Sequence, residues 1–200
     1  MLMVKFTVDN APCYNNLMNN LLNLNSFEEL YAWFEQNSGK EDSVWVNAKR
    51  GKPNNADLNY IDVVYCALCF GWIDSVCKNI DGVTYQKLTP RKAKSHWTYL
   101  NIVRCMYLAD KGLMTKQGLA AMPQNHEDFK VKDDIINELK KDREAWENFK
   151  NFPELYQRVR LDNIEWARKD KKLFRQRLDK LIETSKQNKM YGQWNDYGRL

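Results

Sequence analysis

A group of polar and aromatic residues in the middle of the chain has the composition of a ligand-binding cleft. The group comprises Trp72, Asp74, Tyr85, Lys87, Arg91, Trp97, Asn101 and Arg104. Arginine supplies paired donors for an anionic group, and tryptophan supplies a flat face for stacking. If Asp74, Arg91 and Asn101 converge, we expect a cleft for a small anionic or planar ligand. The alternative is an Asp74–Arg91 ion pair that locks a hairpin to a helix, with Trp72 and Trp97 in the core.

Such a cleft requires a β-hairpin beside a helix, and the sequence predicts both. Asp81-Gly82 separates the strand-like runs 75–80 and 83–88, a pattern that favours a two-residue type I′ turn. Ser95 is the expected N-cap of a helix that extends to about Lys111. We expect Trp97, Asn101 and Arg104 to share one face of that helix, because they are four and three residues apart.

Other local signals predict the remaining elements. We expect a Ser26-to-Glu29 capping box, a strand over 43–50, a buried helix over 60–70 with Asn59 as its N-cap and Gly71 at its end, and a short helix capped by Thr115. Three further helices are expected over 132–150, 153–169 and 171–186. The predicted fold class is α+β: a small antiparallel sheet (a strand plus the Asp-Gly hairpin) packed with helices, followed by an all-helical C-terminal part. We expect domains at 1–123 (the α+β part with its N-terminal extension) and 132–200, joined by a linker at 124–131.

Cysteine and histidine patterns argue against metal and nucleophilic chemistry. Cys66 and Cys69 have the C-x-x-C spacing, but they fall within an apolar helical run, and the chain contains only two histidines, His96 and His126. A zinc site needs two further ligands, and a redox pair needs an exposed helix N-terminus. We therefore expect buried packing thiols, no metal, no cofactor and no catalytic residues. His96 is the expected surface or cap-adjacent histidine.

The excess of basic over acidic residues lies in the last quarter of the chain. Residues 1–150 contain 19 basic and 19 acidic residues, whereas residues 151–200 contain 12 and 7, which accounts for the net charge of +5. Such a segment could attract nucleic acid, which requires a continuous basic stripe. Asp162, Glu165, Asp170 and Asp179 interrupt it, so a solvated helix face with interspersed signs is the favoured interpretation.

Composition places the chain among ordinary globular proteins. Hydrophobic residues make up 44% and charged residues 28%, which excludes intrinsic disorder and a membrane span. Residues 1–10 lack the apolar region of a secretory signal, and five cysteines are an odd number that suits reduced thiols. We therefore expect a cytoplasmic protein; its oligomeric state stays open.

Several ordered motifs resemble one known family. The motifs are Ala67 to Asp74, Leu88 to Lys92, Ser95 to Asn101, Gly112 to Thr115 and Gly118 to Ala121. Together they resemble the YdeI/OmpD-associated family, also labelled bacteriocin-protection. The resemblance runs from Phe27 to Met122 and continues weakly from Lys132 to Leu181. One departure is Ser95-His96-Trp97-Thr98, where the family commonly has Ser-x-Trp-Ser.

The resemblance implies a role in antimicrobial-peptide or stress resistance and no settled catalytic mechanism. We therefore expect a non-enzymatic protein that acts through binding a ligand or partner. Two alternatives remain: an enzyme of unknown reaction with its cleft at Asp74, Arg91 and Asn101, and nucleic-acid association through the basic C-terminal helices.

Overall fold

The computed structural model describes residues 21–93, 95–123 and 130–200. The chain divides into two compact units, Met1–Lys92 and Ala93–Leu200. Residues 124–129 of the predicted linker lie outside the described residues, as does Cys13. No helix in the described ranges is long and apolar enough to cross a membrane.

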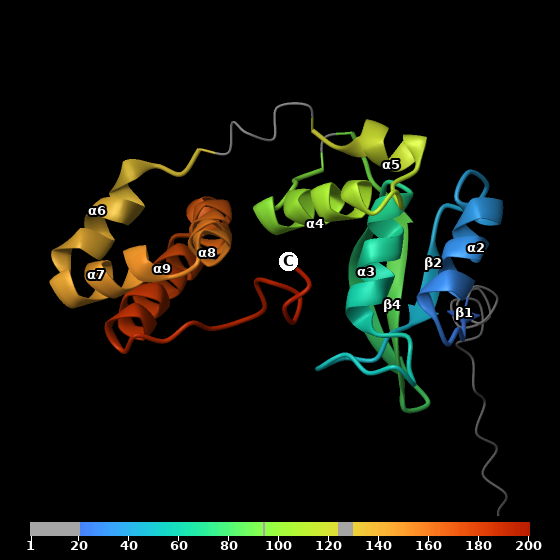
Figure 1. Ribbon diagram of the computed structural model, residues 1–200, viewed down its shortest axis with the longest axis horizontal. Coiled ribbons are helices and arrows are strands. Elements are labelled where there is room, and N and C mark those ends of the chain that lie inside the picture. Colours follow the sequence, from blue (N-terminus) through green and yellow to red (C-terminus); the bar gives the residue numbers. More distant parts are fainter. Residues whose placement is uncertain (1–20, 94, 124–129) are drawn as a thin grey trace, which may run out of the picture. The chain divides into compact units, whose positions relative to one another are not determined.

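The first unit is a four-stranded sheet with two helices (Figure 1). Its elements are β1 (Leu21–Leu22), α2 (Phe27–Asn37), β2 (Val44–Asn47), α3 (Tyr60–Cys69), β3 (Trp72–Ile80) and β4 (Val83–Pro90). The strand order is β1-β2-β4-β3. The α+β class is confirmed, but the sheet is mixed rather than antiparallel, because β1 pairs parallel with β2. The short strand β1 was not predicted.

The β3–β4 hairpin turns where its sequence predicts. Asp81 and Gly82 have φ values of 49° and 83°, and positive φ at both central residues is what a type I′ turn requires. Strand β3 begins at Trp72 rather than near Ser75. A register irregularity between Asp74 and Cys77 interrupts its pairing with β4. The hairpin is therefore longer than predicted.

Helices α2 and α3 pack on one face of this sheet around a cluster of aromatic rings. Phe34 stacks on Phe70 with ring centroids 5.1 Å apart, and it meets Trp72 edge-on at 5.2 Å. Val44 and Leu88, which are paired across β2 and β4, are buried on this face. Burial of aromatic and aliphatic groups here stabilises the unit.

Helix starts follow the predicted side-chain caps only in part. The Ser26 hydroxyl accepts a hydrogen bond from the Glu29 amide and the Thr115 hydroxyl accepts one from Gly118, as expected. Asn59 precedes α3 but makes no side-chain cap, because its side-chain oxygen accepts the Asn54 amide of the preceding loop instead. The helix expected from Ser95 begins at Tyr99, with Thr98 as its N-cap.

The second unit is helical (Figure 1). Its elements are α4 (Tyr99–Asp110), α5 (Lys116–Ala121), α6 (Asp133–Lys141), α7 (Arg143–Asn151), α8 (Glu154–Trp166), the 3-10 turn η2 (Ala167–Lys169) and α9 (Lys171–Lys186). The single helix expected over 132–150 is wrong. Asp142 is extended there and its carboxylate accepts the Ala145 amide, so it ends one helix and caps the next.

The C-terminal tail packs against this unit. Tyr191 and Trp194 pack on the buried cluster that contains Tyr156. The two oxygens of Asp196 accept hydrogen bonds of 2.8 and 2.7 Å from the Arg104 guanidinium on α4. The Asp196 side chain is 1% exposed and that of Arg104 is 12% exposed, so the pair is shielded from water.

We predict that Asp196→Ala lowers the free energy of unfolding of the second unit by about 3 kcal/mol, because it leaves a guanidinium buried without its carboxylate. Chemical denaturation followed by circular dichroism measures the change. The matched control is Asp179→Ala, which removes the partner of Arg175 in a pair whose side chains are 52% and 58% exposed; it should cost under about 1 kcal/mol. Equal losses in the two variants would contradict the assignment.

Candidate functional site

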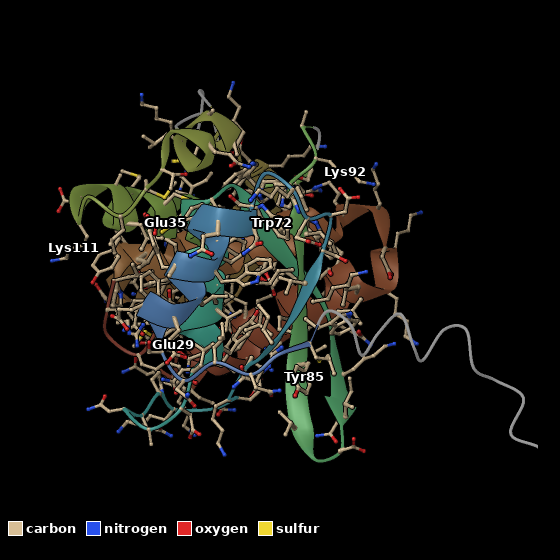
Figure 2. The ribbon with its side chains drawn as sticks, turned by 90° about the vertical axis from the view of Figure 1, so that its right-hand side faces the viewer. Glu29, Glu35, Trp72, Tyr85, Lys92 and Lys111 are labelled. Carbon is tan, nitrogen blue, oxygen red and sulfur yellow. The ribbon has the colours of Figure 1, made fainter. Side chains whose placement is uncertain are left out.

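Two of the predicted site residues lie on the helix-covered face of the first unit. Trp72 is fully buried in the aromatic cluster described above (Figure 2). A carboxylate oxygen of Asp74 accepts a hydrogen bond of 2.7 Å from the Tyr60 hydroxyl on α3. The ion-pair alternative required the Arg91 guanidinium at this carboxylate. Among the described residues, the hydrogen bond to Asp74 comes from Tyr60 instead. Arg91 follows β4, and its amide donates to the Gly71 carbonyl.

Tyr85 and Lys87 lie on the opposite face of the same sheet. Lys87 is next to Leu88, and successive side chains of a strand point to opposite faces. Tyr85 donates a hydrogen bond of 2.5 Å to Asn23, and the Lys87 ammonium lies 5.9 Å from the Trp45 ring centroid. Figure 2 labels Tyr85 on the hairpin. The structure therefore does not bring Tyr85 and Lys87 onto the face that holds Asp74.

The other three residues belong to the second unit. Trp97 precedes α4 instead of lying on it, so the shared helix face was wrong for that residue. Asn101 and Arg104 are brought together: the Asn101 side-chain oxygen accepts a hydrogen bond of 2.7 Å from Arg104. The convergence of Asn101 with Asp74 and Arg91 stays a prediction, because these residues belong to different compact units.

A cavity of about 710 Å³ in the second unit is a better candidate for a binding site than the predicted cleft. It is lined by His96, Lys130, Asp162, Glu165, Trp166, Ala167, Arg168, Lys169, Asp170 and Leu173. This volume suits a small organic molecule. A second cavity, of about 260 Å³, lies in the first unit between the loop after β2 and the tip of the hairpin.

Asp162 is the most unusual group in the larger cavity. Its side chain is on α8 and the residue is 1% exposed. One oxygen accepts a hydrogen bond of 2.9 Å from the Tyr99 amide, at the first turn of α4. The other oxygen, Oδ1, is buried and has no hydrogen-bond partner among the described residues.

Burial raises the pKa of Asp162 to about 6, although the Tyr99 hydrogen bond and the charge of Arg158 oppose the rise. Removal from water disfavours the charged form, and here that effect exceeds the two favourable interactions. A carboxyl in a cavity that titrates near neutral pH is a common feature of functional sites.

An ion-pair network holds one wall of the cavity. The Arg168 guanidinium donates to both oxygens of Glu165, at 2.5 and 2.7 Å, and to both oxygens of Asp134, at 2.8 and 2.9 Å. These contacts lower the pKa of both carboxyls. They tie η2 to α8 and α6. In this wall, the Arg168 guanidinium in the turn after Trp166 is therefore held between two carboxylates.

Trp166 supplies an accessible aromatic surface at the same place. It is 55% exposed, an uncommon degree for a tryptophan. The Arg177 guanidinium carbon lies 5.4 Å from its ring centroid, and the His96 ring lies 6.4 Å away. The cavity thus combines a buried carboxylate with an exposed ring, a pairing suited to orienting a planar polar ligand.

Cysteine chemistry and metal binding find no support among the described residues. Cys66 and Cys69 are buried free thiols in α3, and burial raises the pKa of Cys66, which makes it a poor nucleophile. The described part of the chain holds no group of three side chains suited to binding a metal ion.

The basic residues near the C-terminus are largely engaged within the protein. Arg168 binds Glu165 and Asp134, Arg175 pairs with Asp179, and Arg177 donates to the Asn163 carbonyl. These contacts favour the interpretation of a mixed-charge helix face over a continuous stripe for phosphates.

In the sequence, Asp162 and Glu165 stand out only as acids that interrupt a basic segment. For Asp162, the one feature of the sequence that could have indicated burial is its position. It lies three residues after Val159 and two before Ile164, both of which are buried on α8. An acid so close to the inward stripe of a helix is a candidate for burial. The partner that receives it, the start of α4, is 63 residues away in sequence.

We predict that the stability of wild-type protein falls relative to Asp162→Asn as the pH rises from 4 to 7. Because the pKa of Asp162 is raised to about 6 in the folded state, the folded carboxyl keeps its proton where the unfolded one has released it. Stability is therefore lost between the two pKa values, by at most about 3 kcal/mol. Urea denaturation at a series of pH values measures it.

Asp134→Asn is the control of opposite sign. Arg168 lowers the pKa of Asp134, so this variant should lose stability relative to wild type as the pH rises. Parallel pH profiles for wild type and Asp162→Asn would contradict the assignment of a raised pKa.

Two family models match the chain in separate segments. Residues 22–121 match the family described as Domain of unknown function (DUF8412). Residues 128–188 match the family described as Bacteriocin-protection, YdeI or OmpD-Associated. The searches of curated proteins and of solved structures found no match.

The resemblance to the YdeI/OmpD-associated family is confirmed, but its location differs from the one expected. The motifs between Phe27 and Met122 lie in the segment that matches the other model, and the weak C-terminal continuation is where the YdeI/OmpD-associated model matches. The chain belongs to the DUF8412 family, whose model covers half of its length, and its C-terminal helices match the YdeI/OmpD-associated family.

Proposed function

We propose that this protein is a non-enzymatic ligand-binding protein of the cytoplasm, in which the cavity beside Asp162 and Trp166 holds the ligand. The observation that carries the proposal is the buried Oδ1 of Asp162, which has no hydrogen-bond partner among the described residues and belongs to a residue that lines a cavity of about 710 Å³. Buried polar groups are ordinarily hydrogen-bonded, so an unpaired one in a cavity indicates a place for a ligand atom.

The position of the cavity relative to the family match supports the same proposal. Every lining residue except His96 falls within residues 128–188, the YdeI/OmpD-associated segment. The proposed ligand site therefore belongs to that domain rather than to the hairpin of the first unit. A contribution to antimicrobial-peptide or stress resistance follows as part of the proposal, through binding rather than through turnover.

An enzymatic role is the second candidate, and one observation favours it. A carboxyl with a pKa of about 6 can exchange a proton near neutral pH. In this second candidate, the residue proposed to take part in the reaction is Asp162 instead of Asp74, Arg91 and Asn101. Mass spectrometry of each bound ligand after prolonged incubation distinguishes the two roles, because only an enzyme changes the mass or identity of what it binds.

We predict that a thermal-shift screen of small metabolites finds compounds that stabilise the wild-type protein and lose their effect in Asp162→Asn and Trp166→Ala. A ligand present at 100 times its dissociation constant adds about 2.7 kcal/mol to the free energy of unfolding. Native mass spectrometry of the full chain gives the stoichiometry, expected to be one.

Met106→Ala is the control, because Met106 is an exposed apolar side chain of the same unit that does not line the cavity. It should keep the full ligand response. Stabilisation that persists in both cavity variants, or the absence of any stabilising compound, would refute the proposed site.

A further inference from the structure

The carboxylates that line the larger cavity differ in what they already bind. Both oxygens of Glu165 accept hydrogen bonds from Arg168. Asp170 caps α9, where its Oδ1 accepts a hydrogen bond of 3.0 Å from the Leu173 amide. Within the described ranges, Asp162 accepts a hydrogen bond from the Tyr99 amide, and its Oδ1 has no partner. Among these three carboxylates, Asp162 is therefore the one with a buried oxygen that can still accept a hydrogen bond.

The charge around Asp162 is only partly balanced. Tyr99 contributes an amide at the start of α4, where the partial positive charge of a helix end favours an anion. Arg158, also on α8, lowers the pKa of Asp162 through its charge, yet burial has the larger effect. A buried carboxylate in such a position gains most from a charged donor, because a charge-assisted hydrogen bond is stronger than a neutral one.

The aromatic side of the cavity also accommodates a cation. The Arg177 guanidinium already lies 5.4 Å from the centroid of the Trp166 ring, which is cation–π distance. With the indole 55% exposed, part of its surface remains available to a ligand. Trp166 can therefore contact the flat body of a cationic molecule.

We propose that the ligand of this cavity is an organic cation, whose protonated amine or amidinium group donates to Oδ1 of Asp162 while its planar body packs on Trp166. The inference rests on the proposed function, because it names the ligand class of the same site. A neutral donor leaves the buried negative charge unbalanced, and an anionic ligand is repelled by it. The cation replaces the missing partner and neutralises the carboxylate in one step.

Binding of this kind is coupled to a proton. Protonated Asp162 does not attract a cation, so affinity should fall as the pH falls through about 6. The charged or titratable groups near Asp162 are Arg158 on α8 and the other such groups that line the cavity, namely His96, Lys130, Glu165, Arg168, Lys169 and Asp170. A protonated His96 would also repel a cation. His96→Gln is therefore needed to assign the pH dependence to Asp162.

The experiment compares three probes of one shape and different charge: benzamidine, benzamide and benzoate. Isothermal titration calorimetry and protein NMR on the full chain at pH 7.5 should show benzamidine binding at least tenfold tighter than benzamide, and no binding of benzoate. Asp162→Asn should weaken benzamidine binding at least tenfold and leave benzamide unchanged. His96→Gln should keep the loss of affinity below pH 6.

Asp170→Asn is the matched acid-to-amide control in the same cavity, because asparagine keeps the helix cap. It should weaken benzamidine binding far less than Asp162→Asn does, because the Asp170 carboxylate already caps α9. A circular dichroism melt of each variant confirms that it is folded. Trp166→Ala should weaken benzamidine and benzamide alike, since it removes the stacking surface that both use.

Equal affinity for benzamidine and benzamide, or equal losses in Asp162→Asn and Asp170→Asn, would overturn the inference. Preferred binding of benzoate would overturn it as well and would assign the site to Lys130, Lys169 or Arg168. If the three probes fail but the metabolite screen yields neutral or anionic ligands that depend on Trp166, the ligand class is wrong and the proposed function stands. If neither experiment yields a ligand of the cavity, both are wrong.

Discussion

The hydrogen bond between the Asp162 carboxylate and the Tyr99 amide is the contact on which the second unit and its cavity depend. It joins α8 to the start of α4 across 63 residues of sequence. The helix end partly compensates the buried charge, but not fully, which is why the pKa of the carboxyl remains raised. One oxygen therefore has a structural role, and the other is buried without a hydrogen-bond partner among the described residues, in a residue that lines a ligand-sized cavity.

Helix α4 is held a second time by the C-terminal tail. Arg104, which the sequence analysis placed among ligand-binding residues, is bound by Asp196 and Asn101. A guanidinium with that many acceptors is well satisfied. The two contacts come from different parts of the chain, α8 and the tail, and in both a carboxylate accepts hydrogen bonds from a donor on α4. The polar residues of this helix thus help to assemble the unit that contains the cavity.

Signals confined to a few neighbouring residues predicted the fold well. Asp81-Gly82 produced its hairpin, Ser26 and Thr115 capped their helices, and the apolar stripe of 171–186 produced α9 with the expected bounds. Where two local signals competed, the prediction was less accurate. Thr98 rather than Ser95 caps α4, and Asp142 divides a continuous apolar stripe into two helices by capping Ala145.

The candidate site shows the limit of such signals. Residue type and spacing select Asp74, Arg91 and Asn101 because they are polar and near tryptophans, and strand alternation then separates Tyr85 and Lys87 from Asp74. The sequence by itself determined the elements, because caps, turns and apolar periodicity act over three or four residues. Only the tertiary structure decided that Asp162 is buried while Asp170 and Asp179 are not, since desolvation depends on which distant helix covers an acid and how many of its oxygens that helix can bind.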